Sequence, residues 1–427
     1  MRRLPLAIAT VFLVAAPLIA AVRLTYMDRP GGKPVPLFWS ANAFPLQYTV
    51  DRRVVDLIPG GESAIASAFG VWSSVPDAKV SFQSGGVQNG LRASQDNKNT
   101  VTMCDGLFSG QGAIAMTTNW HDTDTGEMHE ADIMIDPSIA SSGYSVQQAI
   151  EHEAGHFLGL DHSAVLSSVM YPYVGKEGLA SLDSDDKIAI ANLYPRVDPN
   201  GAGATLKGKV TGNDGAIFGA QVVAVNDEGQ PVATALSDAN GEFVLQAVPA
   251  GNYRIYAEPL DGPVDPRNLA GVWRDAKMTS FPTRFVNGAP LAVTNGNVYG
   301  NLVVNASGAP VQLNPKWIAT CAVNSSDFSL MSVPSVLRPG QTVSLAVGGD
   351  GFTSGMTKFE VLNPAIQRIS EFRYGSNFAY ATFRVAPDAK GGSTVVQVTS
   401  GNDTATLTGA LRIDAGSGAP RVRLVRK

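Results

Sequence analysis

The chain has 427 residues, of which 44% are hydrophobic and 16% are charged, and its formal net charge is −5. This length suggests about three domains of ordinary size, and the apolar content is sufficient for packed cores. The sequence contains no lysine-rich run or basic stripe, so nucleic acid is not an expected partner.

Residues 1–21 are typical of a secretory signal peptide, because two arginines precede an apolar run that ends in small residues. An uncleaved membrane anchor is the alternative, since about 18 apolar residues approach the length that spans a bilayer. Pro17 interrupts the run and favours a cleaved signal. We therefore expect a secreted, extracellular protein without a membrane span after signal removal. Association with the cell surface is left open.

Residues 36–197 combine strand and helix patterns and are predicted to form one domain. Alternating apolar residues predict strands at 46–50, 78–83, 100–103, 113–117 and 131–135. Helical spacing over 62–74 places Ile65, Phe69 and Trp72 on one buried stripe.

Two further helices have recognisable first turns. Ser145 and Gln148 fit a capping box, which predicts a helix that begins just after Ser145. Asp185 and Asp186 follow Asp183 and suit the first turn of another helix, where acidic side chains complement the helix dipole.

A predicted hairpin turn around residues 122–126 carries several oxygen ligands. Asp122, Asp124 and Glu127 surround a glycine, and carboxylates at this spacing suit Ca²⁺, so a calcium or second-metal site is one hypothesis. A tight turn selects Asp, Thr and Gly for backbone reasons alone. We favour the turn.

Residues 152–162 contain the candidate metal ligands and the candidate general base. His152 and His156 are four residues apart on the predicted helix, so both can bind one Zn²⁺ at about 2.0–2.1 Å. Glu153 lies beside the first ligand, where a carboxylate can reach a metal-activated water without binding the metal. Gly159 can leave the helix with positive φ and bring His162 back as a third ligand. Three protein ligands plus water are the arrangement of a catalytic zinc.

The complete pattern H-E-x-x-H-x-x-G-x-x-H is followed by Ser168–Pro172, which contains Met170. These motifs, with the run 182–194, resemble the metzincin metalloproteases, specifically the matrixins (matrix-metalloproteinase-like, peptidase M10). The resemblance implies an α+β catalytic domain with a twisted sheet plus three helices. It also implies that Met170 forms a Met-turn that supports the metal site. Residues 113–117 become the candidate edge strand to which a substrate peptide adds.

One position departs from the matrixin pattern. In many matrixins a Pro-x-Tyr sequence after the Met-turn forms a wall of the main specificity pocket. Here Tyr173 follows Pro172 directly and Val174 occupies the place of the tyrosine, so side-chain preference is not transferred.

Beyond a linker at 198–203, short strands separated by Asn/Asp-Gly turns predict two all-β sandwich domains. Residues 204–310 resemble carboxypeptidase-regulatory-like modules, and 311–415 resemble immunoglobulin-like repeats of bacterial surface proteins. Residues 416–427 form a tail. Cys104 and Cys321 fall in different predicted domains, which favours buried thiols over a disulfide.

The sequence therefore predicts a multidomain, secreted zinc metalloendopeptidase with protein or peptide substrates. Peptide bonds of extracellular proteins would be hydrolysed by metal-activated water, with Glu153 as general base and His152, His156 and His162 as zinc ligands. The alternative is an extracellular adhesion or binding protein whose β-sandwich domains carry the main function by binding a surface, glycan or protein target.

Overall fold

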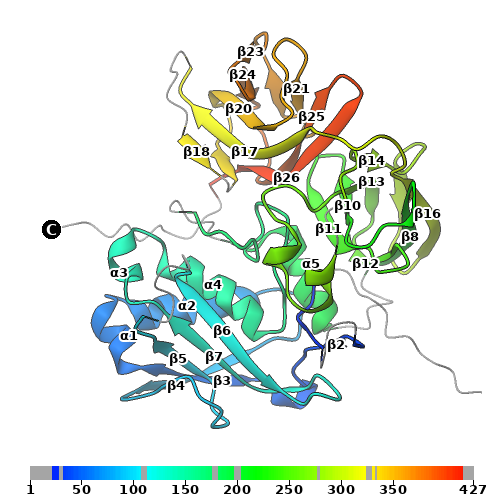
Figure 1. Ribbon diagram of the computed structural model, residues 1–427. Coiled ribbons are helices and arrows are strands. Elements are labelled where there is room, and N and C mark those ends of the chain that lie inside the picture. The colour runs from blue at the N-terminus through cyan, green and yellow to red at the C-terminus, as the bar shows by residue number, and fades with distance from the viewer. Residues whose placement is uncertain are drawn as a thin grey trace, which may run out of the picture.

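The computed structural model describes residues 22–27, 32–106, 113–175, 181–196, 203–276, 279–323, 329–331 and 334–416. The predicted signal peptide lies outside the described residues, as do 198–202 of the predicted linker and 417–427 of the predicted tail. Figure 1 shows three lobes: one with most of the helices, and two made almost entirely of strands. Within the described residues, no helix has the length and apolar character needed to cross a bilayer.

The first lobe is built on a five-stranded sheet. Its strand order is β4-β3-β5-β7-β6, in which β6 alone is antiparallel to its neighbour and forms one edge. The strands are β3 (Leu46–Asp51), β4 (Phe82–Gln88), β5 (Thr100–Met103), β6 (Ala115–His121) and β7 (Met128–Ile135). The predicted edge strand is therefore present as β6, and it begins two residues later than the predicted 113–117.

The strand predicted at 78–83 is largely wrong. Ala78 and Val80 are buried as expected, but Ala78 forms an isolated bridge with Pro195, and the Lys79 N–H donates to the Tyr194 carbonyl. This segment therefore hydrogen-bonds to the end of the domain, and the strand next to β3 begins only at Phe82.

Three long helices match the predicted ones: α2 (Gly61–Ser73), α4 (Val146–Phe157) and α5 (Ser184–Leu193). Two short helices were not predicted, α1 (Arg52–Leu57) and α3 (Ile139–Ser142). Residues Ile65, Phe69 and Trp72 of α2 are buried in the core that α2 and α4 share with the sheet. Ahead of this sheet, the short strands β1 (Thr25–Tyr26) and β2 (Val35–Pro36) pair with each other, and η1 (Ala41–Ala43) follows.

The second lobe packs two sheets against each other around its own core, as predicted for a β-sandwich. Its strands are β8 (Ala204–Gly212), β9 (Gly215–Ala216), β10 (Gln221–Asn226), β11 (Pro231–Leu236), β12 (Glu242–Val248), β13 (Gly251–Glu258), β14 (Arg284–Phe285), β15 (Leu291–Val293) and β16 (Val298–Asn305). Two 3₁₀ turns, η2 (Pro266–Asn268) and η3 (Gly271–Asp275), lie in the long connection after β13.

The third lobe is also a two-sheet sandwich with a separate core. Its strands are β17 (Asn314–Cys321), β18 (Ser329–Met331), β19 (Ser335–Leu337), β20 (Thr342–Asp350), β21 (Lys358–Val361), β22 (Ile366–Arg368), β23 (Arg373–Tyr374), β24 (Phe378–Val385), β25 (Gly392–Ser400) and β26 (Asp403–Ile413). Cys104 lies in the first lobe and Cys321 in the third, and no disulfide joins them. Cys321 is buried as expected, whereas Cys104 is only partly buried.

The lobes are in extensive contact around the start of α5, which the sequence did not indicate. Thr234 of β11 donates its hydroxyl to Asp185 at 2.7 Å, and Ser393 of β25 donates to Asp183 at 2.9 Å. The side chains of Leu166 and Tyr171, from the first lobe, belong to the hydrophobic core of the third. In Figure 1, α5 and β11 lie where the lobes meet.

Candidate metal centre

Helix α4 carries two of the three histidines and is anchored at several points. The Ser145 side chain caps its first turn by accepting from the Gln148 N–H at 3.2 Å. The predicted capping box is only half formed, because the Gln148 side-chain oxygen is buried without a hydrogen-bond partner. Farther along the helix, two indoles anchor its backbone: Trp72 donates to the Glu151 carbonyl at 2.8 Å, and Trp39 donates to the Phe157 carbonyl at 2.7 Å. The helix is therefore a rigid base for metal ligands.

The chain leaves α4 at Gly159, as predicted. Its φ is +97°, and a Cβ atom there would lie 2.9 Å from the Leu37 carbonyl oxygen. A residue with a side chain would be strained in this conformation and would also clash with a neighbouring backbone. The turn brings His162 back beside the helix.

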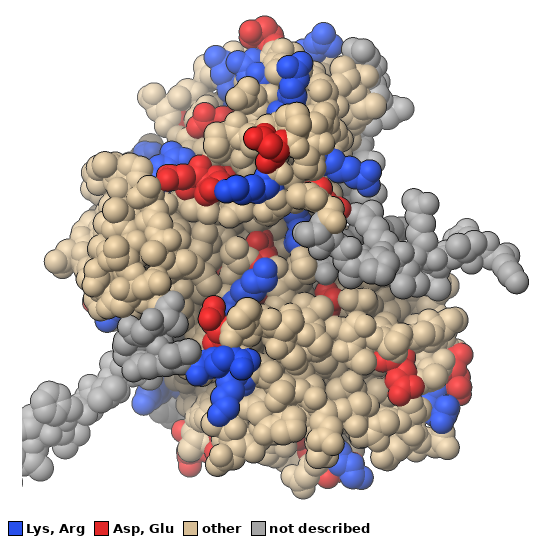
Figure 2. Space-filling view, turned by 180° about the vertical axis from the view of Figure 1, so that it is seen from behind, with Lys and Arg blue, Asp and Glu red and all other residues tan. Residues whose placement is uncertain are grey.

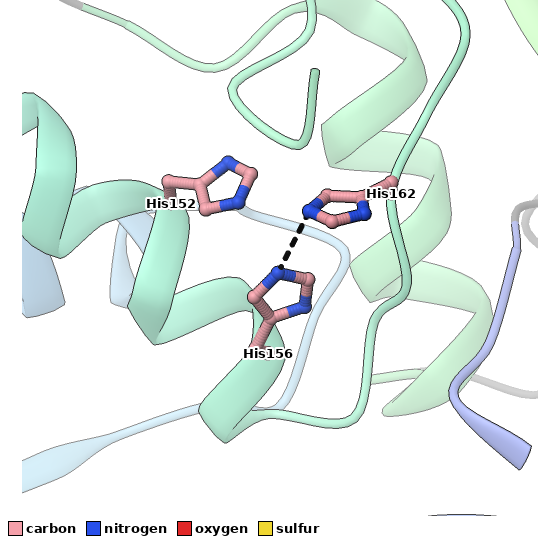
Figure 3. Close-up of side chains that lie close together, drawn as sticks. All are labelled: His152, His156 and His162. Atoms are coloured by element: carbon pink, nitrogen blue, oxygen red, sulfur yellow. Dashed lines mark hydrogen bonds between the residues drawn. The ribbon is translucent and has the colours of Figure 1, made fainter. Parts of the chain in front are cut away.

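The three histidine rings converge (Figure 3), and their candidate ligand nitrogens all lie within 4.8 Å of one another. The Nε2 atoms of His156 and His162 are 3.3 Å apart. Two nitrogens bound at about 2.0–2.1 Å to a tetrahedral Zn²⁺ are separated by roughly the same distance. Among the described residues, this is the one group of three or more His, Cys, Asp or Glu side chains whose ligand atoms gather in this way.

Each Nδ1 atom meets a carbonyl oxygen. His152 contacts the Val169 carbonyl at 2.7 Å, His156 contacts the Leu160 carbonyl at 2.8 Å, and His162 contacts the Asn268 carbonyl. Because a carbonyl can only accept, each Nδ1 must carry the proton and donate it. This leaves the lone pair of each ring on Nε2, directed at the shared centre, which is the tautomer that metal binding requires.

Burial also sets the protonation state of the three rings. Burial lowers the pKa of His152 to about 3, with a further contribution from His162. Burial lowers the pKa of His156 and His162 in the same direction. The three imidazoles are therefore neutral near pH 7, and a neutral imidazole is the metal-binding form.

Glu153 lies next to the first histidine and faces the edge strand. The Thr117 hydroxyl of β6 contacts its carboxylate at 2.7 Å and its backbone carbonyl at 3.0 Å. Burial raises the pKa of Glu153 to about 7, while the Thr117 hydrogen bond acts in the opposite direction. A carboxyl group with this pKa can both accept and release a proton near neutral pH.

Met170 lies directly against α4. A Cβ atom at Gly155, one residue before His156, would come within 2.1 Å of the Met170 sulfur. Asp186 holds this turn in place by accepting from the Val169 N–H at 2.9 Å and from the Met170 N–H at 3.3 Å. Asp186 also takes part in the capping box of α5, as its position in the first turn suggested.

The hairpin residues do not gather with the histidines. Asp122 Oδ1 accepts from the Asp124 N–H, the Thr125 N–H and the Thr125 hydroxyl at 2.8–3.0 Å. These bonds lower the pKa of Asp122 and are those of a side-chain-stabilised turn. Asp122, Asp124 and Glu127 form no ligand cluster among the described residues. The turn hypothesis accounts for Asp122, and the calcium hypothesis stays a prediction.

Sequence reasoning missed two contributors to this centre. Thr117 could have been suspected from the predicted edge strand, but its register against α4 could not. The carbonyl of Asn268 comes from a different lobe, 106 residues beyond His162, and a backbone acceptor leaves no mark on the sequence.

Two histidines of α4 and a third from the turn after it converge beside a buried glutamate, next to a mixed sheet, as in a metalloprotease-type domain. The family comparison gives the same class: residues 39–195 match the model described as matrixin, and residues 205–261 match the carboxypeptidase regulatory-like domain. The chain thus contains a matrixin domain followed by a carboxypeptidase regulatory-like domain, and its third lobe has the two-sheet form expected of an immunoglobulin-like domain.

Several curated proteases are similar to parts of this chain. Karilysin of Tannerella forsythia is 45% identical over 58 residues, which cover 13% of this chain and 12% of karilysin. The hatching enzyme of Paracentrotus lividus is 29% identical over 174 residues, covering 40% and 28% respectively. Metalloendoproteinase 1 of Glycine max is 29% identical over 168 residues, covering 36% and 52%. The matches therefore span from about an eighth to about half of the relatives' own lengths.

Proposed function

We propose that this protein is a secreted zinc-dependent endopeptidase that cleaves extracellular proteins or peptides. The observation that carries the proposal is the convergence of three Nε2 lone pairs beside Glu153. The matrixin domain supports the class of reaction. The substrate, the secretion and the roles of individual residues belong to the proposal.

Zn²⁺ would be held by His152, His156 and His162, and when bound it supplies Lewis acidity to a water molecule and to the scissile carbonyl. Glu153 accepts a proton from the attacking water and later delivers it to the leaving amine. The Thr117 hydroxyl positions the Glu153 carboxylate for this transfer. Met170 packs against α4 at Gly155, between the first two histidines, and thereby sets the distance between the helix backbone and the turn that contains Met170.

The edge strand β6 supplies the means to bind an extended peptide. β6 pairs with β7 on one side and is the last strand of its sheet, so its other side can accept a further strand through main-chain hydrogen bonds. Since Thr117 of this same strand contacts Glu153, a peptide added there would lie beside the reacting groups.

The decisive experiment is the substitution Glu153→Gln in the full chain, assayed for casein cleavage and for zinc content. The isosteric amide still accepts from Thr117 but cannot accept a proton, so activity should fall by roughly 10²–10⁴-fold while zinc stays bound. Glu62→Gln, an exposed change in the first turn of α2, is the matched control and should leave both readouts unchanged. Retained cleavage in Glu153→Gln would remove Glu153 from its role, and a purified protein that takes up no zinc would refute the whole proposal.

The proposed domain limits are 36–197, 204–310 and 311–415. Three separate hydrophobic cores are consistent with these limits, although Leu166 and Tyr171 of the first lobe belong to the core of the third.

On the face shown in Figure 2, acidic and basic side chains are interspersed among wide uncharged areas. We propose that the two rear lobes bind a surface, glycan or protein target. The alternative, a main function in adhesion, predicts that the effect of the protein on its natural target survives Glu153→Gln, whereas the endopeptidase proposal predicts its loss.

A further inference from the structure

A loop of the second lobe reaches the metal centre of the first. This loop, residues 259–276, follows β13 and contains η2 and η3. Its Asn268 carbonyl accepts from His162, its Ala270 N–H donates to Asp161 at 2.8 Å, and its Val272 N–H donates to Thr25 at 3.3 Å. The loop therefore contacts the third histidine, the residue before it, and the N-terminal strand next to it.

The three histidines differ in where their Nδ1 partners come from. The carbonyls that fix His152 and His156 belong to Val169 and Leu160 of the same lobe. The carbonyl that fixes His162 belongs to Asn268 of the second lobe. Only the third ligand thus depends on the docking of another lobe for its tautomer and ring orientation.

Asn268 is itself held in one conformation. Its side-chain oxygen accepts from the Asp265 N–H at 3.0 Å, while the Asp265 carboxylate accepts from the Arg267 N–H at 2.8 Å. The Asn268 N–H donates to the Asp265 carbonyl at 2.9 Å, and its side-chain amide donates to the Tyr173 hydroxyl at 3.1 Å. These reciprocal bonds close a capping box that directs the Asn268 carbonyl at His162.

Apolar packing fastens the loop to the body of the molecule. Leu260, Leu269 and Trp273 are buried in a small cluster with Leu236 of β11, against which Val22 of the first lobe packs. The contact is therefore a packed junction that includes both lobes, and the hydrogen bond to His162 lies at its edge.

We propose that the second lobe completes the metal site: its loop 265–270 positions His162 for binding a divalent metal ion, and Asn268 is the positioning residue. This inference rests on the proposed function, since it assumes that the three histidines bind zinc. Partners that orient a ligating histidine contribute about 10–100-fold to metal affinity in proteins. The affinity of this site should depend on the loop to the same extent.

The test uses the full chain and the metal alone. Zinc affinity is measured by competition with a chromophoric chelator, and the absorption spectrum of the Co²⁺-substituted protein reports the ligand geometry. The double variant Asp265→Ala/Asn268→Ala removes the capping box and should weaken zinc binding about 10–100-fold. As the conservative variant, Asp265→Asn keeps an oxygen acceptor for the Arg267 N–H but weakens the exposed ion pair with the Arg267 guanidinium, so it should weaken zinc binding less than the double variant does.

A second variant tests the loop without touching the capping box. Ala270→Pro deletes the N–H that donates to Asp161. Leu269 is extended and tolerates a following proline, but the φ of Ala270 is −104°, so the proline ring also shifts the loop backbone next to Asn268. The variant should also weaken zinc binding. The matched control is Asp238→Ala, which removes a similar turn-stabilising carboxylate that accepts from the Asn240 and Glu242 N–H groups in the same lobe.

Unchanged zinc affinity and an unchanged Co²⁺ spectrum in folded Asp265→Ala/Asn268→Ala or Ala270→Pro would overturn the inference while leaving the proposed function intact. Equal weakening in Asp238→Ala would also overturn it, because the effect would then reflect general destabilisation of the lobe. A parent protein that binds no zinc would overturn both. Circular dichroism and thermal unfolding of each metal-free variant identify the variants that are folded.

Discussion

The two halves of the candidate metal centre are supported by different parts of the molecule. His152 and His156 lie on α4, whose carbonyls are fixed by two buried indoles and whose apolar side faces the core of the first lobe. His162 lies on an irregular segment held by the second lobe, and the nearby Met-turn packs into the core of the third through Tyr171. A compact local motif can thus depend on distant domains for part of its geometry.

The largest effect is expected where the two halves touch. In Gly155→Ala the new Cβ atom would lie 2.1 Å from the Met170 sulfur, so either α4 or the Met-turn must move. Overpacking of this kind typically costs about 1–3 kcal/mol of folding free energy. Denaturant unfolding should show this loss, and zinc affinity should fall with it.

Gly70→Ala provides the control for that change. Gly70 is an exposed helical glycine of α2, and a Cβ atom there meets nothing within 4 Å. The substitution should stabilise the protein by about 0.5–1 kcal/mol, because alanine loses less backbone entropy in a helix. If both alanines had the same effect, close packing at Gly155 would not be the cause.

The next effect concerns the junction between the first and second lobes. Thr234→Val removes the hydroxyl that donates to the buried Asp185, and leaves this carboxylate with Ser163 as a side-chain donor. A buried acceptor that loses a partner costs about 1–3 kcal/mol, so the thermal unfolding temperature should fall. Thr382→Val on β24 alters a strand threonine within the third lobe and should have a smaller effect. Equal effects would mean that the junction adds nothing.

The junction between the second and third lobes should respond to pH. Glu258 is buried there and accepts from the hydroxyls of Thr406 and Thr408. Burial raises the pKa of Glu258 to about 7, from an ordinary value near 4.5. The folded state then holds this proton more tightly than the unfolded state does. The resulting stabilisation is complete below about pH 4.5 and is lost as the pH rises through about 7.

Glu258→Gln should remove this dependence, so its unfolding temperature should fall less than that of the parent protein between pH 5.5 and 8. Other buried carboxyl groups titrate in both proteins, and the difference between the two curves isolates Glu258. Parallel curves would contradict the assignment.

Thr117→Val should have the smallest effect, a small shift in the pH dependence of kcat/KM. Thr117 contacts Glu153, which lies on α4. Loss of the hydroxyl that donates to Glu153 removes a bond that favours the ionised carboxylate, so the pKa of Glu153 rises. The acidic limb of the kcat/KM profile should move to higher pH by about one unit or less, since such a bond contributes roughly 0.5–1.5 kcal/mol. Thr118→Val, whose side chain points to the opposite face of β6, should leave the limb in place.

The α4 half was predictable from sequence because its determinants are local. Ser145, the four-residue spacing of His152 and His156, and the positive φ of Gly159 all act within one or two helical turns. Helices α2 and α5 were predictable for the same reason. The apolar stripe of α2 and the acidic first turn of α5 are each formed by residues that are close together in the sequence.

The other half could not be predicted because its determinants are distant or carry no side-chain signal. The carbonyl of Asn268 is chemically the same as any other carbonyl, and its position depends on how two lobes dock. The error at 78–83 has a similar origin: Ala78 and Val80 alternate like a strand, yet their backbone pairs with the end of the domain at Tyr194 and Pro195. Periodicity reports which side chains are buried, and it does not report which backbone they pair with.

Gly155 occupies a position of the histidine motif at which this chain has no room for a side chain. The pattern H-E-x-x-H treats the residue before the second histidine as interchangeable, but in this chain the Met170 sulfur occupies the space that any side chain would need. The Met170 side chain therefore packs directly against the α4 backbone at Gly155. In this chain, a larger residue at position 155 would require the turn 168–172 to lie farther from α4.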